Sequence, residues 1–450
     1  MKRIIVILLL AALLTVPALI STASTKSVAL SHEPALTDMG VTHAAAVEAG
    51  GHGYAWGFNY NGAVGNGVYT GNCPTPYNFG DGVVGVSTNG NTTLYIDMNG
   101  SLWVLGNYWF GTGGDPSMPD DGYFTPTPRL LATDVRSASM GSNHLVFVKN
   151  DNSLWVYGEN GHGQLGNGTT NSVYTPTRLL VGVSYAVAGD CLTAAVKTDG
   201  TLWVWGFNGS GQVGNNSTAD RLTPVQVLTN VYTVSTMGEH VLAIKNDNTL
   251  WAWGSNVYGQ LGTGNTTQRR TPVQVMTGAA QVSAGFYHTG VIKTDGTLWF
   301  CGNNYMGAFG NGTSSGYSQA NASFTQTAGH YLAVSCGLRM SAVISEEGRL
   351  LVAGDNTYGQ LGLGFENNPA GGRFFDVFTP NGLVIIGDER TAGDVNADGV
   401  VDFSDVSLLR ARLDNIAQLS EQGAENADMD RNGRLNENDL ELLLGYILNY

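Results

Sequence analysis

A repeat of about 50 residues constrains the fold of this chain more than any other feature. Its anchor is usually an aromatic residue, one further residue, a second apolar residue and then glycine, as in Trp203-Val-Trp205-Gly206. Seven anchor glycines follow one another at intervals of 49, 52, 48, 48, 48 and 52 residues: Gly57, Gly106, Gly158, Gly206, Gly254, Gly302 and Gly354. Repeats of about 40–50 residues are typical of propellers, in which each unit buries its apolar face against its neighbours.

Each repeat carries the pattern of four short strands. In the fifth copy, alternating residues predict strands at 232–235 and 241–245, and a tight turn around Asp247 leads into the anchor strand. A glycine-rich turn at residues 254–262 and the step Thr271-Pro272 then lead into a fourth strand. Alternation places both anchor aromatics on one face of their strand, so we expect them to pack blade against blade. The sequence predicts an all-β, seven-bladed β-propeller.

These motifs resemble the regulator-of-chromosome-condensation repeat family over about residues 34–387, most clearly in the third to fifth copies. The second copy departs from the pattern at residues 107–111 and carries an insertion at 115–121, and the sixth copy lacks the Thr-Pro step. The resemblance implies a seven-bladed scaffold for recognition and does not imply a reaction. The sequence does not decide whether the ring closes through the N-terminal segment or through residues 383–386.

Two loops near the C-terminus carry oxygen ligands at the spacing that calcium requires. Ca²⁺ takes about six to eight oxygens, and a twelve-residue loop supplies them from positions 1, 3, 5, 7, 9 and 12, with glycine at position 6. Gly399 and Gly433 occupy that glycine position here. The expected ligands are Asp394, Asn396, Asp398, the Val400 carbonyl, Asp402 and Asp405 in the first loop, and Asp428, Asp430, Asn432, the Arg434 carbonyl, Asn436 and Asp439 in the second. The sequence therefore predicts two bound Ca²⁺ ions.

An apolar segment with helical periodicity follows each calcium loop, so each loop and its segment form half of an EF-hand. This duplicated unit resembles a type I dockerin over about residues 388–450. The resemblance implies a small α-helical domain with two EF-hand-like calcium loops, which binds a cohesin module of a scaffoldin and places its host in a cellulosome. The cohesin contacts that it implies are Phe403, Ser404, Arg410, Arg412, Glu437 and Asn438.

The N-terminus has the form of an export signal. Lys2 and Arg3 precede an apolar run from Ile4 to about Ile20, and a plausible cleavage site follows Ala23. We therefore expect a signal peptide at residues 1–23, an N-terminal segment at 24–33, the propeller at 34–387 and the dockerin at 388–450. No later segment is apolar for long enough to span a membrane, so we expect an extracellular, cellulosome-associated protein.

Composition excludes some functions. The net charge is −15, which makes nucleic acid an unsuitable partner. Four cysteines in a chain of 450 residues do not make a disulfide scaffold. Cys301 and Cys336 fall at repeat positions and are interpreted as small apolar side chains, although their pairing stays open.

Two sets of repeated polar residues are interpreted as structural. His43, His144, His240 and His288 each stand fourteen residues before their anchor glycine, and Thr92, Leu192 and Met340 take the same place in other copies. A repeat position on separate blades favours a hydrogen bond inside each blade over a metal site. The acids Asp151, Asp199, Asp247 and Asp295 lie in tight turns, where aspartate bonds to nearby backbone.

Two other acids are weak catalytic candidates. Asp190 and Glu239 follow the glycine after the first strand in adjacent copies, so we expect both at one mouth of the propeller. A pair of carboxylates could serve glycoside hydrolysis; solvated surface acids are the alternative. The sequence contains no Gly-x-Ser-x-Gly, His-Glu-x-x-His or phosphate-binding loop.

One aromatic group lies outside the repeat anchors. Tyr108, Trp109 and Phe110 stand in the turn of the atypical second copy, and tyrosines take the corresponding turns elsewhere: Tyr60, Tyr258, Tyr305 and Tyr358. Exposed aromatics stack on the apolar faces of sugar rings and commonly mark binding sites. Local packing under the insertion is the alternative for Trp109.

Together these features predict a secreted cellulosome component. Its dockerin binds cohesin in a calcium-dependent way, and its propeller recognises plant-wall polysaccharide or another surface partner. The alternative hypothesis is a polysaccharide-degrading hydrolase with its site on a propeller face.

Overall fold

A computed structural model describes residues 37–377, apart from 49, 70, 90, 108–123 and 370. The predicted signal peptide, both calcium loops, the cohesin contacts and the aromatic group Tyr108, Trp109 and Phe110 lie outside the described residues. Within the described part of the chain, no helix has the length and apolar character needed to cross a bilayer.

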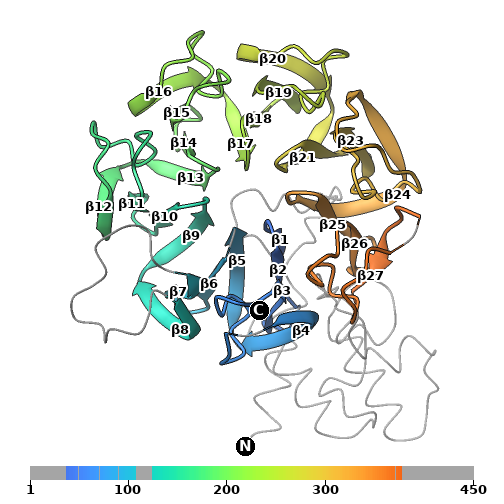
Figure 1. Cartoon of the computed structure of the whole chain (residues 1–450). Helices are drawn as coiled ribbons and strands as arrows, with labels where there is room; N and C mark the ends of the chain where they lie inside the picture. Colours follow the sequence, from blue (N-terminus) through green and yellow to red (C-terminus); the bar gives the residue numbers. More distant parts are fainter. Residues whose placement is uncertain are drawn as a thin grey trace, which may run out of the picture.

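The described strands form antiparallel sheets that surround a common axis (Figure 1). Chain order equals spatial order in every sheet, so each sheet is a meander that runs outward from the axis. The first three units contain β1 (Thr37–Met39), β2 (His43–Val47), β3 (Gly53–Phe58) and β4 (Asn72–Gly80); β5 (Val83–Asn89), β6 (Thr92–Asp97), β7 (Leu102–Asn107) and β8 (Phe124–Ala132); and β9 (Val135–Met140), β10 (His144–Lys149), β11 (Leu154–Gly158) and β12 (Val173–Leu180).

The remaining units follow the same plan. They contain β13 (Val183–Ala188), β14 (Leu192–Lys197), β15 (Leu202–Gly206) and β16 (Arg221–Leu228); β17 (Val231–Thr236), β18 (His240–Lys245), β19 (Thr249–Gly254) and β20 (Arg269–Thr277); β21 (Ala279–Ala284), β22 (His288–Lys293), β23 (Thr297–Gly302) and β24 (Asn321–Cys336); and β25 (Met340–Ser345), β26 (Leu350–Gly354) and β27 (Phe375–Asp376).

Strand β24 belongs to two units. Its 16 residues pair with β23 in the first half, where Thr325 faces Phe300, and with β25 in the second half, where Tyr331 faces Ser345. The strand is therefore the outer strand of unit 6 and the inner strand of unit 7, which joins both units in one seven-stranded sheet. The described strands divide into seven units, and the predicted all-β propeller is confirmed.

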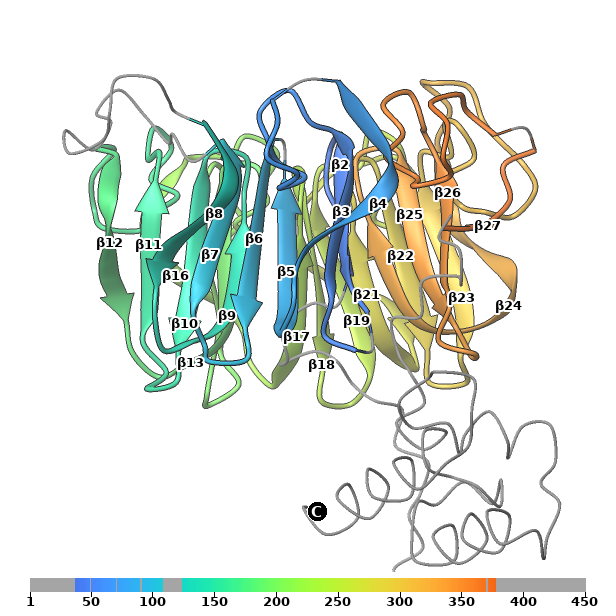
Figure 2. The ribbon, with the colours of Figure 1, turned by 90° about the horizontal axis from the view of Figure 1, so that it is seen from below.

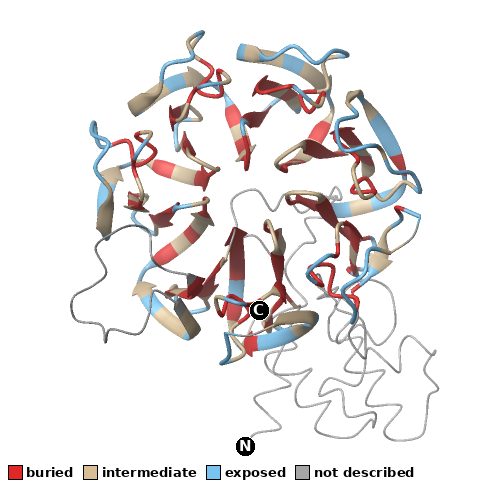
Figure 3. Cartoon of the chain, viewed as in Figure 1, coloured by how far each residue is buried: buried red, intermediate tan, exposed pale blue. Residues whose placement is uncertain are grey.

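Aromatic side chains pack one unit against the next, as predicted. Trp205 and Trp253 are fully buried, and each indole Nε1 donates to a backbone carbonyl of the preceding unit, Gln164 O at 2.9 Å and Gln212 O at 2.8 Å. Inner strands are mostly buried, and outer strands combine half-buried and exposed residues (Figure 3). Burying indole and aliphatic side chains between sheets supplies most of the favourable free energy of such a fold.

The four repeated histidines are structural, as predicted, but the predicted position of their hydrogen bond is wrong. His144 Nε2 lies 2.9 Å from Thr193 Oγ1, which donates to Gln164 O at 2.7 Å, so the bond joins unit 3 to unit 4. The other three join their units in the same way: His43 with Thr93, His240 with Thr289, and His288 with Ser341. All four side chains are fully buried. Each buried imidazole therefore joins one blade to the next through a hydrogen bond.

The repeated aspartates are confirmed as turn residues. Asp247 accepts hydrogen bonds from Thr249 N at 3.1 Å and Thr249 Oγ1 at 2.6 Å, and this hydroxyl accepts the Trp251 indole N–H at 2.9 Å. The Lys245 ammonium lies 4.8 Å above the same indole ring. Asp151, Asp199 and Asp295 begin equivalent chains. The four cysteines are unpaired, with Cys301 and Cys336 buried.

Units 1 and 7 close the ring through contacts between sheets. Met39 N donates to Ser335 Oγ at 3.1 Å, and Trp56 Nε1 donates to Gln360 O at 2.9 Å. Met39 and Trp56 also share one apolar cluster with Val352 of unit 7. Since the described strands of unit 1 are consecutive in sequence, these contacts between side chains and backbone, and not a shared strand, close the ring.

Candidate binding site

The strands place all long turns at one end of the propeller. Because neighbours are antiparallel, the loop before each second strand and the turn after each third strand meet at the same end, here named the turn face (upper side in Figure 2). The short aspartate turns lie at the opposite end, here named the hairpin face. Side chains of neighbouring units can therefore combine at the turn face.

One repeat position contributes a side chain to the turn face in every unit: the residue directly before the second strand. Its carbonyl accepts a hydrogen bond from the residue after the anchor glycine, as in Ser255 N to Glu239 O at 2.8 Å and Asn303 N to Tyr287 O at 2.8 Å. The glycine permits this contact. Gly302 has φ +102, and a Cβ there would lie 2.4 Å from Tyr287 O. This position is named the slot below.

The slot residues of units 5, 6 and 7 are Glu239, Tyr287 and Arg339; aromatic rings contact Tyr287 and Arg339, and the Glu239 charge acts on Tyr287. Together with Tyr258, Phe286, Tyr305 and Tyr317 they form what we name the Tyr287 cluster. The Tyr287 ring centroid lies 5.0 Å from that of Tyr258, edge to face, and Tyr305 lies 5.4 Å from Tyr317 in the same manner. The Arg339 guanidinium lies 5.5 Å from Tyr305 and 5.1 Å from Tyr317.

Electrostatics connect these groups around Tyr287. Burial is the largest cause that raises the pKa of Tyr287, and the neighbouring rings of Tyr317 and Tyr258 raise it further. Arg339 lowers this pKa, whereas Glu239 raises it. The phenol therefore stays protonated near neutral pH and offers both a donor and an acceptor.

The long turn of unit 6 presents Tyr317 to solvent. Asn303 Nδ2 donates to the carbonyls of Tyr317 at 2.7 Å and Gln319 at 3.2 Å, so the amide anchors the end of the turn. The side chain of Tyr317 remains 49% exposed. The departure of unit 6 from the Thr-Pro pattern is thus the feature that adds an aromatic ring to the turn face.

A second aromatic group lies at the seam between units 7 and 1. The Phe58 ring is 5.1 Å from Tyr60 and 5.4 Å from Tyr358, and Tyr60 is 56% exposed. The four turn tyrosines are therefore exposed or half-buried, and three of them make contacts across units: Tyr258, Tyr305 and Tyr358. Trp109 and its two neighbours lie outside the described residues.

The two weak catalytic candidates are each held by a serine of the preceding unit. Ser142 Oγ donates to Asp190 Oδ1, and Ser210 Oγ donates to Glu239 Oε2 at 2.7 Å. Glu239 is exposed and belongs to the Tyr287 cluster, whereas Asp190 lies in the equivalent loop of unit 4. Both carboxylates are at the predicted end of the propeller, each with its own hydroxyl partner.

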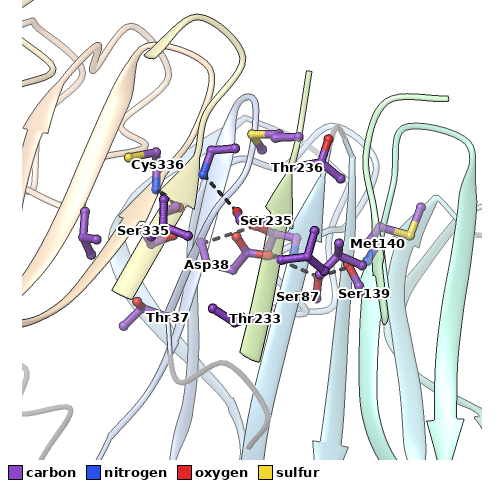
Figure 4. Close-up of a pocket in the computed structure, with 18 of the residues that line it drawn as sticks. Thr37, Asp38, Ser87, Ser139, Met140, Thr233, Ser235, Thr236, Ser335 and Cys336 are labelled. Carbon is purple, nitrogen blue, oxygen red and sulfur yellow. Dashed lines mark hydrogen bonds between the residues drawn. The ribbon is translucent and has the colours of Figure 1, made fainter. Parts of the chain in front are cut away.

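The axis contains a separate cavity of about 200 Å³, lined by the innermost strands of all seven units (Figure 4). A ring of hydroxyls surrounds it, because the serine of one inner strand accepts the backbone N–H of the next: Ser87 from Met140, Ser139 from Ala188, Ser235 from Ala284, Ser283 from Cys336 and Ser335 from Met39. Val187 interrupts the ring in unit 4.

Asp38 takes the serine position of this ring in unit 1. Its Oδ2 accepts the Thr88 N–H at 2.7 Å and the Ser87 hydroxyl at 3.1 Å. Burial raises the pKa of Asp38 to about 6, against the hydrogen bonds from Thr88 and Ser87, which lower it. The carboxylate therefore performs a structural role that a serine performs in five other units.

Sequence reasoning missed Asp38, Tyr287, Tyr317 and Arg339. A signal for two of them was present: comparing the residue before the second strand across copies yields glutamate, tyrosine and arginine in consecutive units. For Tyr317 and Asp38 the repeat offers no spacing signal, because Tyr317 lies in an insertion and the aspartate of the first strand falls outside the anchor motif.

Comparisons with known proteins agree with this arrangement. The model of the regulator of chromosome condensation (RCC1) repeat matches residues 151–196, 199–244 and 247–292, and a second model of this repeat matches 135–164, 279–308 and 332–360. The model of the dockerin type I domain matches residues 392–448. These matches cover the third to seventh copies of the repeat and the C-terminus.

Relatives with known structures share the fold. Human WBSCR16 is 20% identical with a TM-score of 0.62, over 73% of this chain and 94% of that one. Prp20p of Saccharomyces cerevisiae is 19% identical with a TM-score of 0.61, over 68% and 81%. The E3 ubiquitin-protein ligase HERC2 of Homo sapiens is 30% identical over 134 residues, which span 27% of this chain and 3% of that relative.

Proposed function

Because this chain joins a propeller of regulator of chromosome condensation repeats to a C-terminal type I dockerin domain, we propose that it is a non-catalytic cellulosome subunit whose turn face binds plant-wall polysaccharide. The dockerin implies a cohesin partner and an extracellular, cellulosome-associated location. The propeller would then present its ligand site to the substrate of the assembly.

The Tyr287 cluster carries the proposal for the propeller. Sugar rings expose apolar C–H faces that stack on tyrosine, while their hydroxyls need a few well-placed polar partners. The cluster supplies both kinds of contact, with partly exposed rings from units 5 and 6 and the charged side chains of Glu239 and Arg339. Its members come from three adjacent units, so an extended chain could cross the seams between them.

The C-terminal domain would attach this propeller to a scaffoldin. Its calcium loops offer carboxylate, amide and carbonyl oxygens, the donor set that Ca²⁺ prefers. In a domain this small, metal binding and folding are coupled. We therefore expect a chelator to abolish cohesin binding and to leave the thermal transition of the propeller unchanged, which differential scanning calorimetry and a cohesin pull-down would measure together. Cohesin binding that survives complete chelation would contradict the calcium-dependent part.

The propeller proposal is tested with the full-length mature protein on soluble and insoluble plant polysaccharides. Depletion from solution and released reducing ends are read in the same tubes. We expect depletion without product, and we expect Tyr317→Ala to abolish it. Tyr77→Ala, which removes a similarly exposed tyrosine from outer strand β4, is the matched control and should bind normally.

Two outcomes would overturn the proposal. Reducing ends above the blank would instead support the hydrolase hypothesis and direct attention to Asp190→Asn and Glu239→Gln. Neither depletion nor product would exclude polysaccharide binding and favour a protein partner.

A further inference from the structure

We propose that the Tyr287 cluster selects a neutral polysaccharide chain that carries isolated uronic acid groups, with the sugar carboxylate bound by Arg339. This inference rests on the proposed polysaccharide function and names the class of ligand for the same site.

Arg339 is a half-buried cation without a counter-ion in the described residues. Its Nε atom is buried and has no hydrogen-bond partner there, and none of the ion pairs among the described residues includes it. Arg136, another partly buried arginine, also has an unpaired buried Nε, but its terminal nitrogens donate to Asn152 Oδ1 at 3.1 Å, Ser184 O at 2.8 Å and Val183 O at 3.3 Å. The terminal nitrogens of Arg339 have no such bond among the described residues, so they are the donors available to a ligand.

The surroundings of Arg339 fix its guanidinium in place. Two tyrosine rings lie at 5.5 and 5.1 Å from its central carbon, and Asp355 N donates to the Arg339 carbonyl at 3.0 Å. Stacking on aromatic faces leaves the planar edge of a guanidinium free, and this edge matches a carboxylate with two parallel hydrogen bonds. Little side-chain freedom would be lost on binding, since the rings already hold the cation.

The tyrosines make a sugar the natural bearer of that carboxylate. Tyr305 and Tyr317 offer rings and phenol groups beside Arg339, so a pyranose could stack while its acid group reaches the guanidinium. An acidic peptide would use the arginine but would not need this set of aromatic rings. A uronic acid satisfies both observations.

Charge outside the cluster limits how acidic the polysaccharide can be. Residues 24–387 contain 22 acidic and 14 basic side chains, and Glu239 lies within the cluster itself. A polyanion with one carboxylate per sugar would be repelled along most of its length, while only one charge could pair with Arg339. A neutral backbone with sparse uronic acids keeps the favourable contact and avoids the repulsion.

The test compares glucuronoxylan with the same polymer after chemical reduction of its carboxyl groups, using the full-length protein in calcium and titration calorimetry. We expect the native polymer to bind at least about tenfold more tightly, the usual order for a charge-assisted pair. Arg339→Gln should remove that difference. Arg349→Gln, which removes the same charge from unit 7 at its surface ion pair with Asp376, should retain it.

Each remaining outcome decides a separate point. Equal binding of both polymers would overturn the uronic acid inference and leave the polysaccharide function standing, whereas binding of neither would overturn both. Tighter binding of polygalacturonate than of glucuronoxylan would overturn the preference for isolated acids. If Arg339→Gln fails to fold, Arg339→Lys and Tyr317→Leu provide the test, because each should lose most of the preference while the thermal transition stays cooperative.

Discussion

The hairpin face and the turn face of this propeller use the same repeat in opposite ways. At the hairpin face, units 3 to 6 repeat one chain of contacts, in which aspartate binds a hydroxyl, the hydroxyl accepts an indole N–H, and a lysine covers the indole. At the turn face, one repeat position holds Glu239, Tyr287 and Arg339 in consecutive units. Residues that recur from copy to copy build the blades, and a repeat position whose residue differs between copies forms the candidate site.

The difference lies in whether polar groups are satisfied. Each hairpin chain uses its donors and acceptors internally, so it has little left to offer a ligand. Arg339 at the turn face has a buried nitrogen without a partner in the described residues, and neighbouring tyrosines keep exposed area. This contrast separates stability from binding, and mutations should reveal it.

The largest effect is expected from the repeat itself. Trp253→Ala removes a fully buried indole and its hydrogen bond to Gln212 O, which should lower the free energy of unfolding by about 3–5 kcal/mol. Tyr258→Ala, at the turn face in the same unit, should change stability by less than about 1 kcal/mol. Urea unfolding measures both. A similar loss of unfolding free energy in the two variants would contradict the distinction between residues that stabilise the blades and residues that form the candidate site.

Acid should weaken the histidine hydrogen bonds between blades. Burial lowers the pKa of His144 and His240 to about 3, and that of His288 to about 4. The folded protein keeps these rings neutral while the unfolded chain takes up protons below pH 6.5, so stability is complete above that pH and falls as the pH falls towards 4.

Each such histidine should contribute a slope of up to about 1.4 kcal/mol per pH unit. The free energy of unfolding should therefore fall less steeply between pH 7 and pH 5 for His240→Gln, with a slope smaller by up to about 1.4 kcal/mol per pH unit. Unfolding in urea measures it. The intercept also falls, so the slope is the decisive quantity. An unchanged slope would show that His240 is not held neutral.

The smallest effect concerns the axial ring. Asp38→Ser restores the residue that five other units carry, and it removes a carboxylate whose pKa burial raises to about 6. A raised carboxyl pKa costs stability above pH 6 and costs nothing below about pH 4, since both states are then protonated.

We therefore expect Asp38→Ser to gain about 1 kcal/mol at pH 7, a value reduced from the full shift because Asp38 is only partly buried, and the gain should disappear near pH 4. Thermal unfolding at the two pH values measures it. A loss of stability at pH 7 would mean that the Asp38 charge has a partner in the cavity. The axial ring would then resemble the turn face, where one repeat position varies, and not the hairpin face.

Periodic features of the fold could be predicted from the sequence, and contacts between units could not. The anchor motif predicted the strands, and the spacing of Asp247 and Thr249 sufficed for the turn because both partners lie in one hairpin. The partner of His144 lies 49 residues away on the next unit, so the repeat alone could not tell a bond inside a blade from one between blades. The Tyr287 cluster escaped prediction for the same reason.

The shared strand β24 gives the ring seams of unequal character. Units 6 and 7 are covalently continuous through it, whereas units 1 and 7 meet only through side-by-side contacts. If the ring opens under heat or under the pull of a scaffold anchored to an insoluble substrate, it should part between units 1 and 7 and not between units 6 and 7. Tyr317 and Arg339 stand on either side of the seam between units 6 and 7, so the proposed ligand site lies where the ring is best able to bear load.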